Sequence, residues 1–194
     1  HTHLPNHKFV KGQPETGVEM AEDLERIAMN FGGENIAACI IEPIAGSTGT
    51  LVPPKGYLKR IREICDKHGI LLIFDEVITG WGRTGSAFAA QEWNVKPDIM
   101  TMAKATTNGV VPMGVVAVKE EIYDSVLDAS SAPEGTPELF HGYTYSGIPV
   151  AVAAALAVQD IFDKEDIFKR AKEMSPYLQD GLQSLKDLKE IVSI

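Results

Sequence analysis

The sequence has little cysteine and no long apolar run. Its two cysteines, Cys39 and Cys65, form no C-x-x-C pair, and no segment resembles a secretory signal or is apolar for long enough to cross a bilayer. A reducing, cytoplasmic location fits best, with both thiols in the core. Basic residues are the minority, since 18 Lys and Arg against 27 Asp and Glu give a formal net charge of -9. This charge opposes binding to nucleic acid or to an anionic membrane, so we expect small-molecule or protein partners.

The two ends predict a fragment of a longer protein. The sequence begins at "HTHLPN" without Met and ends on "KEIVSI", which reads as the start of a strand without a partner. His1 and His3 have no third ligand close by, so we expect a frayed terminus there and no metal ion.

Apolar periodicity predicts an α/β protein with one sizeable core. Helical patterns cover 17–30, 56–69, 86–93 and 148–162, the last being a buried Ala-rich helix, and strand patterns cover 35–43, 70–77, 98–104 and 113–119. Because apolar strands alternate with helices, we expect a mostly parallel sheet with helices on both faces, whose ligands gather at the carboxyl ends of the strands. We place one domain at 1–163, and a linker helix with the start of a second domain at 164–194.

The segment "LLIFDEVITGWGRTG" runs from a buried strand into two carboxylates and a glycine-spaced loop. Asp75 and Glu76 resemble acids that hold magnesium near ATP, but these residues contain no G-x-x-x-x-G-K-[ST] loop. Gly80, Gly82 and Gly85 spell G-x-G-x-x-G, yet the two acids would lie where a pyrophosphate has to sit. We therefore favour turn glycines over a dinucleotide site. The third interpretation is a carboxylate aimed at a cationic ligand.

Two further segments favour the third interpretation. Lys104 ends the apolar strand that follows the Asp75 strand, and a lysine in such a place can form a Schiff base. A plain surface lysine, or a salt bridge to Asp75, is the alternative. The loop "HGYTYSG" could hold phosphate oxygens through Thr144 and backbone N–H groups, or be an ordinary loop. An acid, a lysine and a phosphate loop together suit a phosphorylated pyridine aldehyde.

The segments "IIEPIAGSTGTLVPPKGYLKRIREICDKHGILLIFDEVITGWGRTG", "KPDIMTMAKATTNGVVPMG" and "HGYTYSGIPVAVAAALA" closely resemble class III aminotransferases. These are pyridoxal-phosphate enzymes of fold type I, and the resemblance covers nearly the whole chain. Within the class, "KGQPETG", "EPIAGS" and "TNGVVPMG" look most like omega-amino acid (beta-alanine)–pyruvate aminotransferases. The resemblance implies that the chain is most of a cofactor-binding large domain.

The resemblance also implies roles for individual residues. Lys104 would bind pyridoxal phosphate as a Schiff base and then shuttle a proton. Asp75 would pair with the pyridine nitrogen and keep it protonated, and Val77, two residues along the same strand face, would pack on the ring. Thr144 would bind the cofactor phosphate in the site of a neighbouring subunit, which implies a homodimer. Glu42 would lie near the cofactor without touching it, unless it is only a charged strand terminus.

The resemblance implies an aminotransferase that moves an amino group from an omega-amino acid such as beta-alanine, or from an amine, to pyruvate. The route is a ping-pong reaction through pyridoxamine phosphate. Ser47, where some relatives that use 2-oxoglutarate carry an acid, favours pyruvate as the acceptor, and Ile148 departs from the His of many members. The family's N-terminal phosphate-binding segment and its carboxylate-binding arginine are not among these residues, so we expect this segment alone to be nearly inactive. A mutase or decarboxylase of the same fold, or a non-catalytic domain, remains the alternative.

Overall fold

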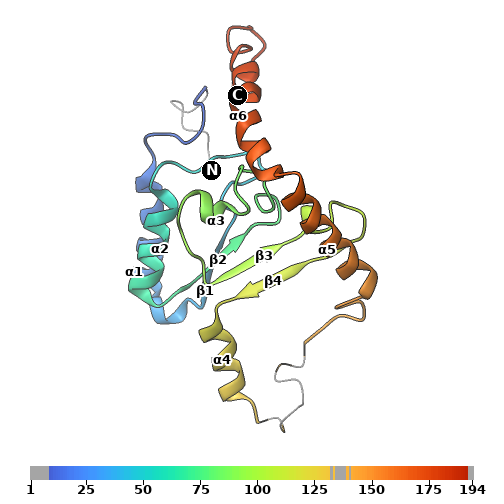
Figure 1. Cartoon of the computed structure of the whole chain (residues 1–194). Helices are drawn as coiled ribbons and strands as arrows, with labels where there is room; N and C mark the ends of the chain where they lie inside the picture. Colours follow the sequence, from blue (N-terminus) through green and yellow to red (C-terminus); the bar gives the residue numbers. More distant parts are fainter. Residues whose placement is uncertain (1–8, 132, 134–138, 140, 192–194) are drawn as a thin grey trace.

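The computed structural model describes residues 9–131, 133, 139 and 141–191 (Figure 1). His1, His3 and the last residues of the expected C-terminal strand lie outside the described residues. The elements, in order, are η2 (Val18–Ala21), α1 (Glu22–Phe31), η3 (Gly33–Asn35), β1 (Ala38–Ile41), α2 (Tyr57–His68), β2 (Leu71–Asp75), α3 (Ala89–Glu92), β3 (Ile99–Met102), η4 (Lys104–Thr106), β4 (Val115–Val118), α4 (Glu120–Ala129), α5 (Pro149–Lys164) and α6 (Ile167–Gln183).

The four strands form one sheet in the order β1-β2-β3-β4. The first three strands run parallel, with Ile41 opposite Phe74 and Asp75 opposite Thr101, and β4 pairs with β3 in the antiparallel sense. This topology confirms the predicted α/β class with a mostly parallel sheet. Because β1, β2 and β3 point the same way, their carboxyl ends meet at one edge of the sheet, where ligands of such folds bind.

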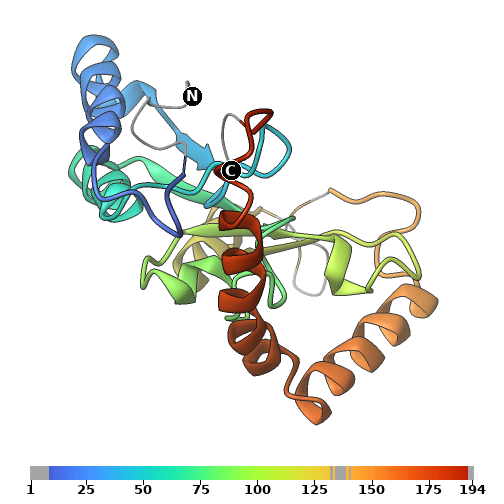
Figure 2. The same cartoon turned by 90° about the horizontal axis from the view of Figure 1, so that it is seen from above.

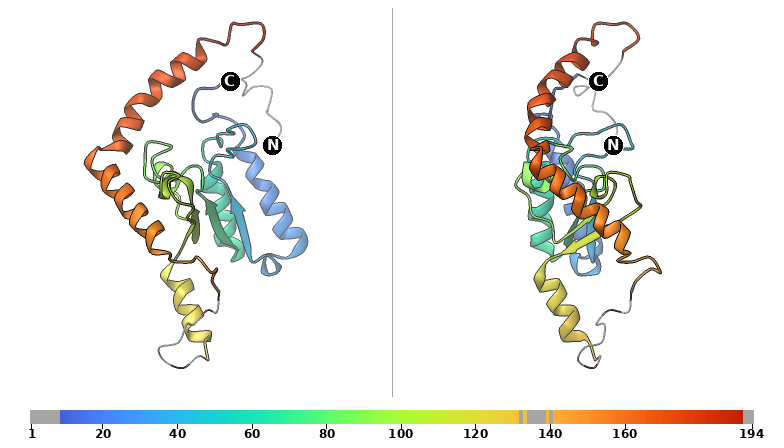
Figure 3. Two further views of the ribbon diagram at one scale, coloured as in Figure 1. Left: turned by 90° about the vertical axis from the view of Figure 1, so that its right-hand side faces the viewer. Right: turned by 45° about the vertical axis from the view of Figure 1, so that its right-hand side comes forward.

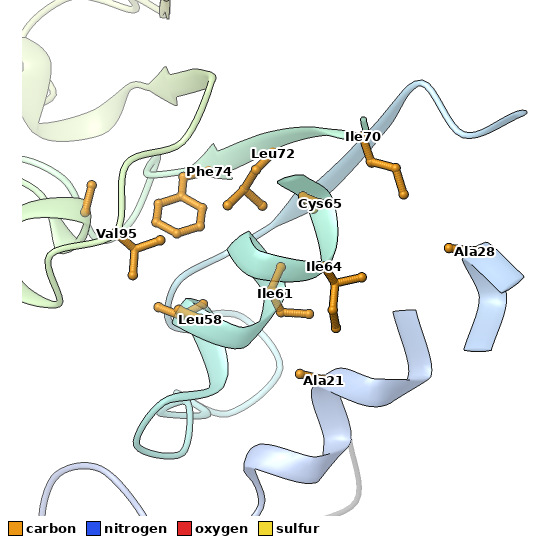
Figure 4. Close-up of a cluster of buried hydrophobic side chains, with 11 residues drawn as sticks. Ala21, Ala28, Leu58, Ile61, Ile64, Cys65, Ile70, Leu72, Phe74 and Val95 are labelled. Atoms are coloured by element: carbon orange, nitrogen blue, oxygen red, sulfur yellow. The ribbon is translucent and has the colours of Figure 1, made fainter. Parts of the chain in front are cut away.

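The hydrophobic core lies between α2 and one face of the sheet. Leu72 and Phe74 alternate along β2 and are both 0% exposed, and they point towards α2 (Figure 4). Helix α2 ends at Gly69, whose left-handed backbone (φ 68°) allows the chain to turn directly into β2. Cys65 belongs to this core, as predicted, whereas Cys39 is only half-buried and packs against it.

The opposite face of the sheet is largely open. Ile40 of β1 is 63% exposed and Val116 of β4 is 65% exposed. Helix α5 lies on this side, away from α1 and α2, so helices flank both sides of the sheet (Figure 3). Helix α5 was predicted to be buried, and this detail is wrong. Its buried residues are Ala151 and Val158, while apolar side chains such as Val150, Leu156 and Ile161 are exposed.

Two helical features differ from the sequence expectation. Helix α4 falls in a stretch for which no element was predicted, and none of its side chains is buried. The charged helix expected from residue 164 instead begins at Ile167, after a break in which Asp166 adopts a left-handed conformation (φ 50°). Helices α5 and α6 meet at this break in a V (Figure 2).

The division into two domains between residues 163 and 164 stays a prediction. Over the described range, the helices are too short or too polar to cross a bilayer.

A buried ion cluster around Asp98 ties the sheet to α2. Its carboxylate accepts hydrogen bonds at 2.7 Å from Arg62 Nη1, from Lys119 Nζ and from the backbone N–H of Leu72. Burial raises the pKa of the Asp98 carboxyl, but the bonds from Lys119, Leu72 and Arg62 outweigh burial and hold the pKa below its usual value. Asp98 therefore fixes where β2, β3 and β4 begin or end.

Candidate functional site

Asp75 is the last residue of β2 and lies on the open face of the sheet. Residues alternate between faces, so Asp75 shares its face with Ile73 and not with the buried Phe74. The side chain is half-buried, and its Oδ1 accepts a hydrogen bond from the backbone N–H of Val77 at 3.0 Å. Among the residues that the structure describes, no lysine, arginine or histidine forms an ion pair with Asp75. Its carboxylate is therefore available to a cationic ligand.

Glu76 turns the other way and is completely buried. Its carboxylate accepts three hydrogen bonds: from the Thr79 hydroxyl at 2.6 Å, and from the backbone N–H groups of Ala89 and Ala90 at 2.9 and 2.8 Å. These N–H groups open α3, where a carboxylate is favoured by the helix dipole. Glu76 therefore holds the loop after β2 in place. Sequence reasoning did not separate it from Asp75, although the period-two pattern of Leu72 and Phe74 continues to Glu76 and would have placed it inside.

Lys104 lies two residues beyond β3, in the short helical turn η4, so the prediction that the strand runs to Lys104 is wrong. It is exposed, and its backbone is in the left-handed region (φ 47°). The N–H groups of Thr107 and Gly109 donate to its carbonyl oxygen at 3.4 and 3.3 Å and close the turn. Within the described part of the chain, Lys104 forms no ion pair with Asp75, which removes the salt-bridge interpretation. The structure thus brings Asp75 and Lys104 to the same edge of two neighbouring parallel strands.

Val77 does not continue the strand. Strand β2 ends at Asp75, and Val77 begins the turn 77–80, so the prediction that it shares a strand face with Asp75 is wrong. The chain turns here because Glu76 must reach inward to the start of α3. Val77 nevertheless stays next to the carboxylate through the hydrogen bond from its own N–H.

Glu42 and Ser47 lie at the neighbouring strand end. Glu42 follows β1, is half-buried, and its Oε2 accepts a hydrogen bond from the Gly46 N–H at 2.9 Å. This bond fixes the turn that carries the exposed Ser47. A Cβ atom added to Gly46 would lie 2.5 Å from Ile78 Cδ1, so this turn packs closely against the loop after β2. Glu42 thus stabilises a turn at the same edge of the sheet as Asp75.

Thr144 is exposed in the turn that precedes α5, four residues before Ile148, the N-terminal flank of that helix. The turn is closed by two bonds at 2.9 Å, from Tyr143 N–H to Ser146 Oγ and from Ser146 N–H to the Tyr143 carbonyl. No hydrogen bond joins Thr144 to Asp75 or Lys104 among the described residues. The fold of the single chain therefore leaves Thr144 outside the pair that it brings together.

The glycines of "GWGRTG" serve packing. Gly82 (φ 90°) and Gly85 (φ 87°) both occupy a backbone region that side chains avoid. A Cβ atom at Gly82 would lie 2.6 Å from the Phe168 ring, and one at Gly85 would lie 3.0 Å from Lys172 Cβ. Helix α6 thus packs directly on the loop, which agrees with turn glycines and not with a dinucleotide loop.

Comparisons with known proteins identify the family of this chain. The family described as "Aminotransferase class-III" matches residues 2–194. An omega-aminotransferase of Caulobacter vibrioides is 54% identical over 195 residues, which cover 100% of this chain and 44% of that protein. A beta-alanine–pyruvate aminotransferase of Pseudomonas aeruginosa is 47% identical over 100% of this chain and 43% of its own length. The chain thus spans less than half the length of these relatives.

Solved structures show the same fold. An amine transaminase from an uncultivated Pseudomonas species, in its PLP-bound form, superposes with a TM-score of 0.80 at 42% identity, over 86% of this chain and 37% of that one. Pyridoxal phosphate is the cofactor of class III aminotransferases, and the α/β fold of this chain matches part of the solved transaminase. The chain belongs to the class III aminotransferase family.

Proposed function

We propose that the full-length protein is a transaminase that moves an amino group from an omega-amino acid such as beta-alanine, or from an amine, to pyruvate by a ping-pong route. One observation carries the proposal. Within the part of the chain that the structure describes, a carboxylate and a lysine that form no ion pair lie at the carboxyl edge of two adjacent parallel strands. The names of the omega-aminotransferase and the beta-alanine–pyruvate aminotransferase support the choice of substrates.

The donor set suits pyridoxal phosphate. The cofactor presents a ring nitrogen that must be protonated to act and an aldehyde that reacts with a primary amine. Asp75 offers a carboxylate whose Oδ1 is already held by the Val77 N–H, so little rotamer freedom would be lost on binding. Lys104 offers an exposed amine on a turn fixed by backbone hydrogen bonds. When bound, the cofactor supplies an electron-withdrawing ring that stabilises negative charge on the substrate carbon.

The two residues have separate tasks in this proposal. Asp75 holds a proton on the ring nitrogen, because its carboxylate stabilises the positive charge there. Lys104 binds the cofactor through its Nζ and, once free again, moves a proton as a general base and acid. The geometry separates these tasks, since the acid comes from β2 and the amine from the turn after β3.

The remaining residues extend the proposal. Val77 would pack on the cofactor ring, and Thr144 would bind the cofactor phosphate in the site of a second subunit of a homodimer. The exposure of Thr144 supports this assignment, because its hydroxyl is accessible to another chain. Glu42 would support the site through the turn that it holds, and Ser47, which adds no charge there, favours pyruvate over a dicarboxylic acceptor.

Two further features belong to the proposal. The first is a division into part of the large domain at 1–163 and the start of the second domain at 164–194, which the break between α5 and α6 supports. The second is a cytoplasmic location, which the low cysteine content supports.

The test is an absorption spectrum of the full-length protein after addition of pyridoxal phosphate and dialysis. We expect a visible band that disappears with beta-alanine and returns with pyruvate, and that is missing in Lys104→Ala. Lys119→Ala is the control, because it removes a lysine of the same sheet that is held by Asp98. A folded wild-type protein without the band would contradict the proposal.

Two rivals predict other results. A mutase or decarboxylase of the same fold would form the visible band but would not regenerate it with pyruvate. A non-catalytic domain would show no band at all, and Lys104→Ala would change nothing but stability. The Asp75 carboxylate argues against the second rival, because a fold alone does not require an acid at that edge that forms no ion pair with any described residue.

A further inference from the structure

We propose that Trp81 is a positioning residue for Lys104, acting through Thr106, and that this hydrogen-bonded link sets the Lys104 turn for reaction with the cofactor. The inference rests on the role of Lys104 given under the proposed function. Trp81 belongs to the loop that follows Asp75, and Thr106 ends the turn that begins at Lys104. The link therefore joins the two strand ends that carry the proposed acid and amine.

The link consists of two side-chain hydrogen bonds. The Trp81 indole N–H donates to Thr106 Oγ1 at 2.9 Å, and the Thr106 hydroxyl donates in turn to the carbonyl oxygen of Ala103 at 3.0 Å. The backbone N–H of Thr106 donates to the same carbonyl, also at 3.0 Å. Ala103 directly precedes Lys104, so the position of its peptide group determines where the lysine begins. Thr106 is 3% exposed, which shields both bonds from water.

Two residues have unusual backbone conformations: Trp81, at one end of the link, and Lys104, which directly follows Ala103 at the other end. Lys104 (φ 47°) and Trp81 (φ 59°) are in the left-handed region, which disfavours residues with a Cβ atom. Such conformations persist only where the surroundings enforce them, and they occur most often at functional sites. The contacts that enforce the Lys104 conformation are the Thr106 bonds to Ala103 and the bonds that close the turn on the Lys104 carbonyl.

Aromatic packing fixes the Trp81 ring. The ring centroid of Phe88 lies 4.9 Å from that of Trp81. The ring centroid of Phe162, a residue of α5, lies 6.3 Å from that of Trp81. Phe162 also contacts Phe168 of α6, with centroids 5.4 Å apart. The backbone N–H of Trp81 donates to Ala87 at 2.6 Å. These contacts hold the Trp81 side chain in place independently of its hydrogen bond to Thr106, and a positioning group requires such support.

The test uses cofactor-free full-length protein and measures how fast pyridoxal phosphate becomes attached to Lys104. Samples are reduced with borohydride at set times, and mass spectrometry counts the labelled lysine. Trp81→Phe keeps the aromatic contacts and removes the donor, Thr106→Val keeps the shape and removes the hydroxyl, and Thr106→Ser restores the hydroxyl. Trp93→Phe is the control for loss of an indole, because Trp93 packs against the core and forms no hydrogen bond with Thr106 in the described part of the chain.

We expect Trp81→Phe and Thr106→Val each to slow attachment by about fivefold, the effect of losing one buried hydrogen bond. Thr106→Ser and Trp93→Phe should attach the cofactor at the wild-type rate. In the double variant Trp81→Phe with Thr106→Val, the attachment rate should fall no further than in Thr106→Val alone, because both changes break the same link. Urea midpoints measured on the same samples separate positioning from folding, and if Trp81→Phe fails to fold, the Val and Ser variants of Thr106 decide alone.

The outcomes distinguish two failures. Labelling of wild-type protein that proceeds normally on Lys104 and equally fast in Trp81→Phe and Thr106→Val would overturn the positioning role alone. Slow labelling in Thr106→Ser would also overturn it, since the restored hydroxyl would then be without effect. Absence of any label on Lys104 in the wild type would overturn the proposed function, and the positioning role with it.

Discussion

The adjacent acids Asp75 and Glu76 should respond to mutation in opposite ways. Glu76→Gln and Glu76→Ala should lower the stability of the fold, because Glu76 is completely buried and accepts three hydrogen bonds. Asp75→Asn should leave stability almost unchanged, since an amide oxygen can still accept the bond from the Val77 N–H. It should instead lower transaminase activity by about 100-fold or more, as expected when a charge that stabilises the reacting system is removed.

The size of the Glu76 effect follows from its partners. One of its oxygens accepts two bonds, from Thr79 and Ala89, and the other accepts one, from Ala90. Glutamine would turn its carbonyl to the first two donors and place its NH2 group against the Ala90 N–H, which loses one bond to a charged group at a cost of about 2 kcal/mol. Alanine leaves all three donors without an acceptor and should cost about 4 kcal/mol.

The assay is urea unfolding of the cofactor-free full-length protein, followed by circular dichroism. Because the slope with urea rises with protein size, a loss of about 2 kcal/mol should lower the urea midpoint of full-length Glu76→Gln by about 0.5 M, and the midpoint of Glu76→Ala should fall further. Asp75→Asn should keep its midpoint within about 0.3 M of the wild type. If Asp75→Asn lowered the midpoint as much as Glu76→Gln, the separation into a structural acid and a free acid would be refuted.

Three further predictions concern other parts of the chain. The pKa of Asp98 in the folded protein lies below its usual value, so the carboxylate stabilises the fold above about pH 4 and loses this effect as the pH falls through the folded pKa. The difference in unfolding free energy between wild type and Asp98→Asn, measured with urea, should therefore shrink below about pH 4. Gly82→Ala should lower the melting temperature more than Gly109→Ala, because both have positive φ but only Gly82 is closely packed; equal losses would contradict packing against α6. Thr144→Ala should weaken pyridoxal phosphate binding by about tenfold in an equilibrium titration of the dimer, and unchanged affinity would exclude it as a phosphate ligand.

Local patterns were sufficient for most of the fold. The strands and the helix before Gly69 were predicted because apolar residues recur at period two or 3.6 and glycine permits the left-handed turn. Helix α4 was missed although Ile122, Val126 and Leu127 recur at helical spacing and are its half-buried apolar residues. Helix α5 was taken as buried because it is rich in alanine and valine, but composition does not say what covers a helix. Only neighbouring elements do, and the described chain leaves most of α5 open.

Sequence patterns alone were enough to predict the family, the mostly parallel sheet and the placement of Asp75 and Lys104 near the carboxyl ends of neighbouring strands, although Lys104 lies two residues beyond β3. These depend on spacing along the chain and on the rule that parallel strands share one carboxyl edge. Only the tertiary structure decided that Glu76 turns inward to the start of α3, and that Trp81 reaches Thr106 from a different loop. Such contacts join residues distant in sequence, and their geometry depends on how the loops fold over the sheet, which no local pattern of apolar and polar residues specifies.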